Sequence, residues 1–238
     1  TFVHTVYDGI AAAVASAGVQ KVDGILFDLG VSSLQLDEDA RGFSYSRDAD
    51  LDMRMDPTTG PTAADVLNSY TAGELRRILR EYGEERFAGP IANAIVRTRE
   101  KRPFTRSTEL VELLYGVVPA ASRRTGGHPA KRTFQAIRIE VNGELEQLAD
   151  SLDEAIRRLV PGGRGAVLSY HSGEDRIVKR RFDLAATGGC TCPPRLPCGC
   201  GAVPLVVLAR RAGRVPDDAE AATNPRAASA RLRVLERR

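Results

Sequence analysis

The chain has 238 residues, which is enough for one large domain or two small ones. Its hydrophobic content of 42% and charged content of 27% exclude a disordered chain, and the absence of tryptophan argues against a large base-stacking surface. A formal charge of +3, with an isoelectric point near 8.8, is compatible with nucleic acid binding without requiring it.

No stretch of the sequence predicts a membrane span or an export signal. The apolar run Ala11–Val19 is too short to cross a bilayer and lies between Asp8 and Lys21. We therefore expect a cytoplasmic protein without a membrane partner, and the sequence leaves a homodimer open.

The first clear strand pattern is Val22–Leu29, an apolar run that carries Asp28 near its end and stops at Gly30. Its shortness predicts a strand buried on both faces. Ligands of open parallel sheets bind at the carboxyl ends of the strands, so the pattern predicts a cleft there. A buried strand with a capped turn is the alternative that the pattern alone leaves open. The polar residues expected to line the cleft are Asp28, Ser32, Ser33 and Gln35.

The composition changes at Asp37. The stretch Asp37–Pro61 is rich in Asp, Gly, Ser and Arg and predicts a long connection, and loops of this length are usually functional. A capping box at Thr71–Glu74 predicts a helix start. Further helices are expected at 62–70, 87–98 and 108–118. Residues 37–127 therefore predict an all-helical unit between two α/β segments.

Lys131–Leu159 has a long helical pattern with a kink expected near Asn142 and Gly143, and Pro161–Gly163 is expected to form a turn from helix to strand. Gly165–Ser172 predicts a second buried strand. A basic helix is expected at 175–182, followed by terminal strands at 203–209 and 231–235 that are candidates for an antiparallel pair.

The end of this second strand carries His171, Ser172, Glu174 and Asp175. A single histidine at a strand end is more often structural than catalytic. If the two strands are parallel neighbours, however, both polar ends face one crevice, and this favours a function. Ser32, His171 and Asp28 also allow a hydrolase triad, but no Gly-x-Ser-x-Gly elbow surrounds either serine, which argues against it.

All four cysteines of the chain lie in one Pro- and Gly-rich stretch. Cys190, Cys192, Cys198 and Cys200 form two Cys-x-Cys pairs. Four thiolates can hold a tetrahedral zinc ion, although Cys-x-x-Cys is the more usual spacing. Disulfides are disfavoured in the cytosol. The sequence thus leaves two alternatives, a structural zinc site or reduced thiols in a loop stiffened by proline.

Several long motifs, in this order along the chain, resemble one family. The motifs are Phe27–Asp37, Arg41–Tyr45, Leu51–Asp56, Tyr82–Phe87, His128–Arg138, Val141–Leu145, Ser169–Lys179 and Asn224–Ser229. The chain is similar to the RsmH/MraW family of S-adenosylmethionine-dependent ribosomal RNA methyltransferases, which act on cytidine N4 of 16S RNA in the decoding region of the small subunit.

The resemblance implies an α/β fold, with a Rossmann-like class I methyltransferase domain at residues 1–36 and 128–238. It makes residues 37–127 a helical insert that recognises RNA. It also implies that the cofactor is S-adenosylmethionine and that the partner is 16S ribosomal RNA within the small subunit. Tyr7, Asp28 and Gln35 are the residues that it places at the cofactor.

The resemblance further implies a catalytic set around the target base. Ser32 and Ser33 are placed beside the base, and His171 and Ser172 on the other side of the pocket, with Asp28 nearby. The Gly-Gly-His loop of the family is expected upstream of Thr1, so the domain is expected to be N-terminally truncated. The alternative function is therefore an RNA-binding fragment of that enzyme without catalytic activity.

Overall fold

The computed structural model describes residues 2–32, 41–125, 128–193, 198–209 and 214–238. It divides into two compact units, one made of Thr1–Gly30 with Leu145–Arg238 and the other of Val31–Glu144. The breaks differ from those expected at 36/37 and 127/128. The second break differs because the helix that begins at Ala130 packs with the helical core of the second unit.

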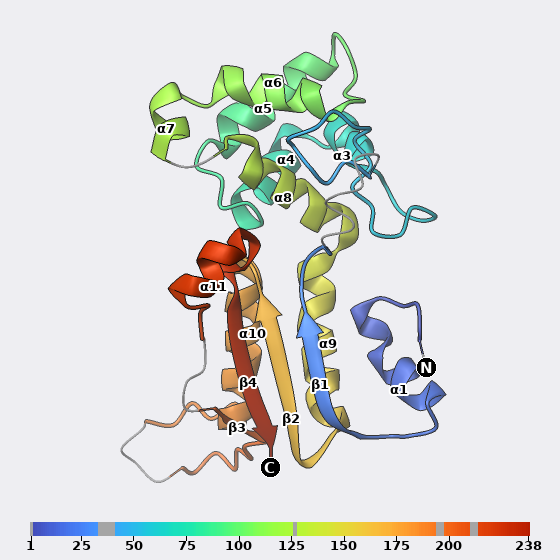
Figure 1. Cartoon of the computed structure of the whole chain (residues 1–238), viewed down its shortest axis with the longest axis vertical. Helices are drawn as coiled ribbons and strands as arrows, with labels where there is room; N and C mark the ends of the chain where they lie inside the picture. Colours follow the sequence, from blue (N-terminus) through green and yellow to red (C-terminus); the bar gives the residue numbers. More distant parts are fainter. Residues whose placement is uncertain (1, 33–40, 126–127, 194–197, 210–213) are drawn as a thin grey trace. The chain divides into compact units, whose positions relative to one another are not determined.

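The first unit is built on a four-stranded mixed sheet (Figure 1). Its strand order is β1-β2-β4-β3, with β1 parallel to β2 and both other pairs antiparallel. The predicted antiparallel pair near the C-terminus is therefore confirmed. The strands are β1 (Val22–Asp28), β2 (Leu159–Ser169), β3 (Val206–Leu208) and β4 (Arg231–Arg237).

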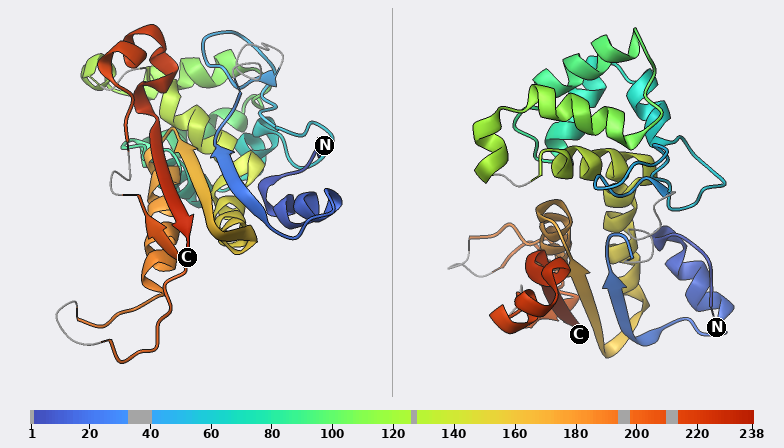
Figure 2. Two further views of the ribbon diagram at one scale, coloured as in Figure 1. Left: turned by 60° about the horizontal axis from the view of Figure 1, so that its bottom comes forward. Right: turned by 45° about the horizontal axis from the view of Figure 1, so that its top comes forward.

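The prediction that the first strand is buried on both faces is wrong. Phe27 and Leu29 are buried, whereas Leu26 between them is 65% exposed. Two helices, α9 (Glu144–Arg158) and α10 (Ser172–Thr187), lie on the same side of the sheet, and their apolar side chains form one core with Phe27 and Val167 (Figure 2). Only the face of β1 that meets these helices is therefore packed in the core.

The turn predicted at Pro161–Gly163 is also wrong, because these residues lie inside β2. Val22 pairs with Leu159, but Gly24 already pairs with Arg164, so β2 carries extra residues opposite β1. Gly162 has a φ of +80° in this irregular part. The register of the pairing therefore shifts at the Pro-Gly-Gly sequence, which lies within β2.

Short helices complete the first unit. They are η1 (Tyr7–Gly9), α1 (Ile10–Ser16), α11 (Asp218–Thr223) and η3 (Pro225–Ser229). In neither unit does a described helix combine the length and apolar character needed to cross a membrane.

The second unit is helical, and local sequence signals define several of its helix ends. Thr71 accepts a hydrogen bond from the Glu74 backbone N–H, and the Glu74 carboxylate accepts one from the Thr71 N–H, which confirms the predicted capping box. Gly143, in the left-handed conformation, ends α8, where the kink was expected. The helices are α3 (Ala63–Ser69), α4 (Ala72–Glu81), α5 (Ala88–Arg99), α6 (Ser107–Val117), α7 (Ala120–Thr125) and α8 (Ala130–Asn142).

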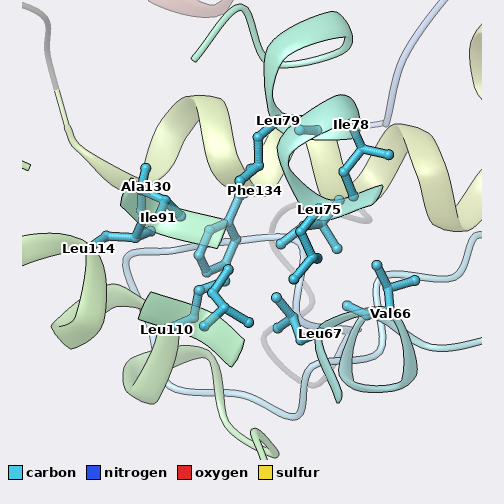
Figure 3. Close-up of a cluster of buried hydrophobic side chains, with 14 of the residues drawn as sticks. Val66, Leu67, Leu75, Ile78, Leu79, Ile91, Leu110, Leu114, Ala130 and Phe134 are labelled. Atoms are coloured by element: carbon cyan, nitrogen blue, oxygen red, sulfur yellow. The ribbon is translucent and has the colours of Figure 1, made fainter. Parts of the chain in front are cut away.

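The core of the second unit gathers around the ring of Phe134 on α8. Leucine and isoleucine side chains from α4, α5 and α6 surround this ring (Figure 3). The loop before α3 is fixed to α8 by one side chain, since the Asn142 amide accepts the Met55 N–H and donates to the Met53 carbonyl. The long connection predicted from composition is therefore anchored at its centre.

Candidate functional site

The candidate site of the first unit lies at the carboxyl ends of β1 and β2. Asp28 is the last residue of β1 and pairs in register with Leu168 on β2. Pairing continues one residue further, where the Leu29 N–H donates to the Leu168 carbonyl over 3.1 Å. The two polar strand ends predicted from the sequence are therefore neighbours at one edge of a parallel pair, which is where open α/β sheets bind ligands.

Asp28 is an exposed carboxylate whose position is fixed by a tyrosine from the neighbouring strand end. The Tyr170 hydroxyl donates to Asp28 Oδ1 over 2.8 Å. Burial of Tyr170, together with this bond to a carboxylate, raises the pKa of the phenol to about 12. Tyr170 therefore remains protonated at neutral pH and serves as a constant donor to Asp28.

Tyr7 lies on the other side of the same residue. Its hydroxyl lies 3.4 Å from the Asp28 carbonyl oxygen, to which it donates, and its ring packs against Phe27 at a centroid distance of 5.6 Å. Tyr7 and Asp28, two of the three residues expected at a cofactor, are thus brought together. The third, Gln35, lies outside the described residues.

The second strand end is organised by a buried carboxylate. Glu174 is 2% exposed and accepts hydrogen bonds from the backbone N–H groups of Tyr170, at 2.8 Å, and His171, at 3.3 Å. In return, His171 Nδ1 accepts the N–H of Glu174 over 3.4 Å, so that His171 caps α10. This exchange holds the chain rigidly where it leaves β2.

The same exchange assigns the tautomer of His171. Because Nδ1 is an acceptor, the neutral ring carries its proton on Nε2. That nitrogen lies 3.3 Å from Glu174 Oε1 but lacks the alignment of a hydrogen bond, and it is buried without another partner among the described residues. The Nε2–H group of a neutral His171 is therefore enclosed beside Glu174.

The remaining polar residues of this strand end differ in what they contact. Ser172 is the first residue of α10 and is exposed. Asp175 forms a two-point ion pair with Arg233 of β4, at 2.7 and 3.0 Å, which ties α10 to the sheet. Asp175 therefore has a structural role. Of the two serines predicted after β1, Ser32 belongs to the second unit and Ser33 lies outside the described residues.

Tyr170 is the site residue that sequence reasoning missed, and Glu174 was seen but given no role. Tyr170 immediately precedes His171 and carries a hydroxyl, which was the available signal. Its contact with Asp28 spans 142 positions and depends on the pairing of β1 with β2, which no local pattern specifies.

His128 in the second unit is a packed histidine. Its ring stacks on Tyr45 at 4.4 Å, and its Nε2 lies 3.2 Å from the Tyr115 hydroxyl. Burial lowers the pKa of its imidazole, so it is neutral at physiological pH. It follows two glycines in the sequence, but those residues, 126 and 127, lie outside the described residues.

Several basic residues of the second unit are bound within it. Arg99 donates to the carbonyls of Leu67 and Tyr70, and Arg102 pairs with Glu109 at 2.6 Å. By contrast, Arg97 and Lys101 are exposed and form no ion pair with any described residue. These two cations, on either side of the C-terminus of α5, are available to an anionic partner.

The four cysteines are brought together in the first unit. Their sulfur atoms all lie within 4.8 Å of one another, and all four are free thiols in the structure. They lie in the loop between α10 and β3, in a different segment from the polar strand ends.

A mixed α/β unit with an exposed carboxylate at the carboxyl end of a parallel strand belongs to the ligand-binding α/β class, which includes the nucleotide-dependent transferases. The chain belongs to the MraW methylase family, whose family model matches residues 1–238. The family resemblance read from the motifs is thereby confirmed. The chain is a methyltransferase by family, and its sheet with helices fits such a fold.

The relatives agree with this assignment. Each of the following is named ribosomal RNA small subunit methyltransferase H. The chain is 62% identical to that of Saccharopolyspora erythraea, over 99% of the chain and 71% of the relative. Identity is 56% to that of Mycolicibacterium smegmatis and 58% to that of Kineococcus radiotolerans, each over 100% of the chain. The chain spans 63% and 60% of the length of these last two relatives.

Proposed function

We propose that the protein containing these residues transfers a methyl group from S-adenosylmethionine to N4 of a cytidine in the decoding region of 16S ribosomal RNA. Membership of the MraW methylase family and the names of the relatives support this proposal. A ribosomal substrate implies that the protein acts in the cytoplasm, on RNA within the small subunit.

The strand end at Asp28 is the observation that carries the proposal. Its carboxylate is exposed, Oδ1 is held by Tyr170, and Oδ2 accepts no hydrogen bond from any residue the structure describes. A fixed carboxylate with a free oxygen suits the N–H and O–H donors of a nucleoside, and Tyr7 adds an aromatic ring beside it. These residues fit the adenosyl or amino acid part of the cofactor.

The cofactor supplies a methyl group already activated on a sulfonium, so the task left to the protein is mainly alignment. The exocyclic amine of cytosine is a poor nucleophile because its lone pair is delocalised into the ring, and it must lose a proton when the methyl group is transferred. A target base must also leave its stack to reach a pocket at a strand end.

We keep Ser32, Ser33, His171 and Ser172 as candidate residues for contacts with the target base, as the family resemblance implies. The tautomer of His171 restricts its role, since a neutral ring with its proton on Nε2 donates to an acceptor atom and does not remove the amine proton. In this proposal His171 acts as a positioning residue, which holds the strand end in place through its exchange of hydrogen bonds with Glu174. The amine proton passes to an oxygen acceptor, for which the Asp28 carboxylate is the candidate, because a serine hydroxyl is too weak a base to keep a proton.

Methyl transfer by the complete gene product tests the proposal. Small-subunit particles that lack the modification are incubated with methyl-labelled S-adenosylmethionine, and the labelled nucleoside is identified by mass spectrometry after digestion. We expect N4-methylcytidine as the product. Label on another base, or on N3 or C5 of cytosine, would contradict the assigned chemistry.

Calorimetry of the 238-residue chain with the cofactor tests the alternative of a non-catalytic RNA-binding fragment. Tight binding of the cofactor would reject that alternative.

The exposed cations of α5 give a separate prediction for RNA binding. The double variant Arg97→Ala with Lys101→Ala is expected to weaken binding to the 16S RNA about tenfold at low salt. Each lost phosphate contact reduces the number of counterions that are released when the protein binds. The slope of log K against log salt should become shallower by about one unit per contact.

A control for this experiment is Arg164→Ala in the first unit, an exposed arginine paired with Glu236. It removes one positive charge, against two in the double variant, and should leave the salt slope unchanged. Equal slopes for the wild-type chain and the double variant would show that α5 does not contact the RNA backbone.

A further inference from the structure

The loop between α10 and β3 is closed at its neck. The Leu205 N–H donates to the Ala185 carbonyl over 2.8 Å. At Gly188 an added Cβ would lie only 2.6 Å from the carbonyl carbon and oxygen of Val203, so the two ends of the loop pass each other in backbone contact. The described parts of the loop between these ends, coloured orange in Figure 2, extend away from the sheet.

Little apolar packing is available to hold the loop beyond this neck. Val203 is 70% exposed, and Cys198 and Cys200 are exposed as well. The described residues 189–193 and 198–205 contain no helix or strand. Loops of this length without secondary structure need another source of order, or they remain unordered.

The four cysteines provide the internal contacts of the loop. Cys198 Sγ lies 3.4 Å from Cys190 Sγ and 3.3 Å from Cys200 Sγ, and all four sulfurs fall within a span of 4.8 Å. Four ligands at about 2.3 Å from one tetrahedral zinc ion are about 3.8 Å apart. The cluster therefore has the dimensions of a tetrathiolate metal site, contracted on one side.

We propose that Cys190, Cys192, Cys198 and Cys200 bind one zinc ion as a closed, structural tetrathiolate site. Four thiolate ligands fill a tetrahedral shell, so no position is left for a water molecule or a substrate. Binding displaces the thiol protons into solvent, and the 2+ charge offsets thiolates that would otherwise repel one another. The ion would join the two cysteine pairs of the loop, just as the backbone contact between Gly188 and Val203 joins its two ends.

Two features of the cluster favour zinc over a pair of disulfides. Cys198 contacts two cysteine sulfurs at nearly equal distances, so the arrangement does not single out one partner for a disulfide. Two of the thiols are half-buried and two exposed, which suits an ion held at the surface of a loop. The two Cys-x-Cys pairs are more closely spaced than most zinc ligands, but their four sulfur atoms nevertheless converge.

Metal analysis of the whole chain, purified with zinc and a reducing agent and then dialysed against metal-free buffer, tests this site. We expect one zinc ion per chain by plasma mass spectrometry. Replacement by Co²⁺ should give the intense visible bands of a tetrahedral thiolate complex. The double variant Cys192→Ser with Cys198→Ser should retain about one tenth of the wild-type zinc or less. The variant Thr191→Ser, at a position between two ligands, should retain the full amount.

A second measurement on the wild-type chain does not depend on any variant. The loop contains Arg195, so trypsin can cleave it there. Removal of zinc by a chelator is expected to speed this cleavage about tenfold while the remainder of the chain stays intact. The proposal is overturned if the reduced wild-type chain retains no zinc and all four thiols react with a thiol reagent, or if its intact mass shows disulfides.

Discussion

Asp28→Asn is expected to lower methyl transfer by at least about 100-fold, because it removes the charge from the one exposed carboxylate at the end of β1. Asparagine keeps the shape of the side chain and can still accept the Tyr170 hydroxyl bond, so the strand end should keep its structure. The measurement is the initial rate of methyl transfer to small-subunit particles, with cofactor binding followed separately by calorimetry. A loss confined to KM for the cofactor would give Asp28 a binding role, and a loss in kcat would place it at the reacting groups.

Asp23→Asn is the matched control. Asp23 is an exposed aspartate at the other end of the same strand, so the substitution changes the charge by the same amount. It should leave both the rate of methyl transfer and cofactor binding within about twofold of wild type.

Tyr170→Phe tests the positioning of Asp28 and should lower the rate of methyl transfer by an intermediate factor of about ten. Wild-type transfer by Asp28→Asn would exclude this strand end as the cofactor site.

Features of the fold that depend on a few neighbouring residues could be predicted from the sequence. The capping box of Thr71 and Glu74 and the break at Gly143 follow from local chemistry, namely paired N–H groups and a left-handed backbone. Asp28 was predicted to line a cleft from the strand pattern and Tyr7 was named through the family resemblance, and the structure places the two in contact. That they contact the cofactor remains a prediction.

Features that depend on distant pairing could not be predicted in this way. Leu26 has the sequence context of a buried strand, yet its exposure is set by which strands and helices pack against β1. Pro161–Gly163 has the composition of a turn, but it lies within β2, where the register of the pairing with β1 shifts. The hydrogen bond of Tyr170 to Asp28 likewise exists only once two strands have met, so no local pattern contains it.

Phe134→Ala is expected to destabilise the second unit by about 3–5 kcal/mol, the usual range for emptying an aromatic site in a packed core. The ring is 3% exposed and lies among side chains from three other helices (Figure 3). The Tyr45 ring meets it in an edge-to-face arrangement, with the two ring centroids 5.9 Å apart. Rigid helices on several sides prevent the site from collapsing, so most of the cavity persists. This loss is a large part of the stability of a domain of this size.

Hydrogen exchange resolved along the chain is the measurement for this variant, because it separates the two units. Amides of α4, α5, α6 and α8 should exchange faster in Phe134→Ala, while those of α9 and α10 keep their protection, since their core is a different cluster. Phe134→Leu should cost only about 1–1.5 kcal/mol. Leu184→Ala, at a residue 48% exposed on α10, should cost less than about 0.5 kcal/mol. Equal loss of protection in α9 and α10 would mean that the two cores unfold as one, and the helical unit would then have no stability of its own.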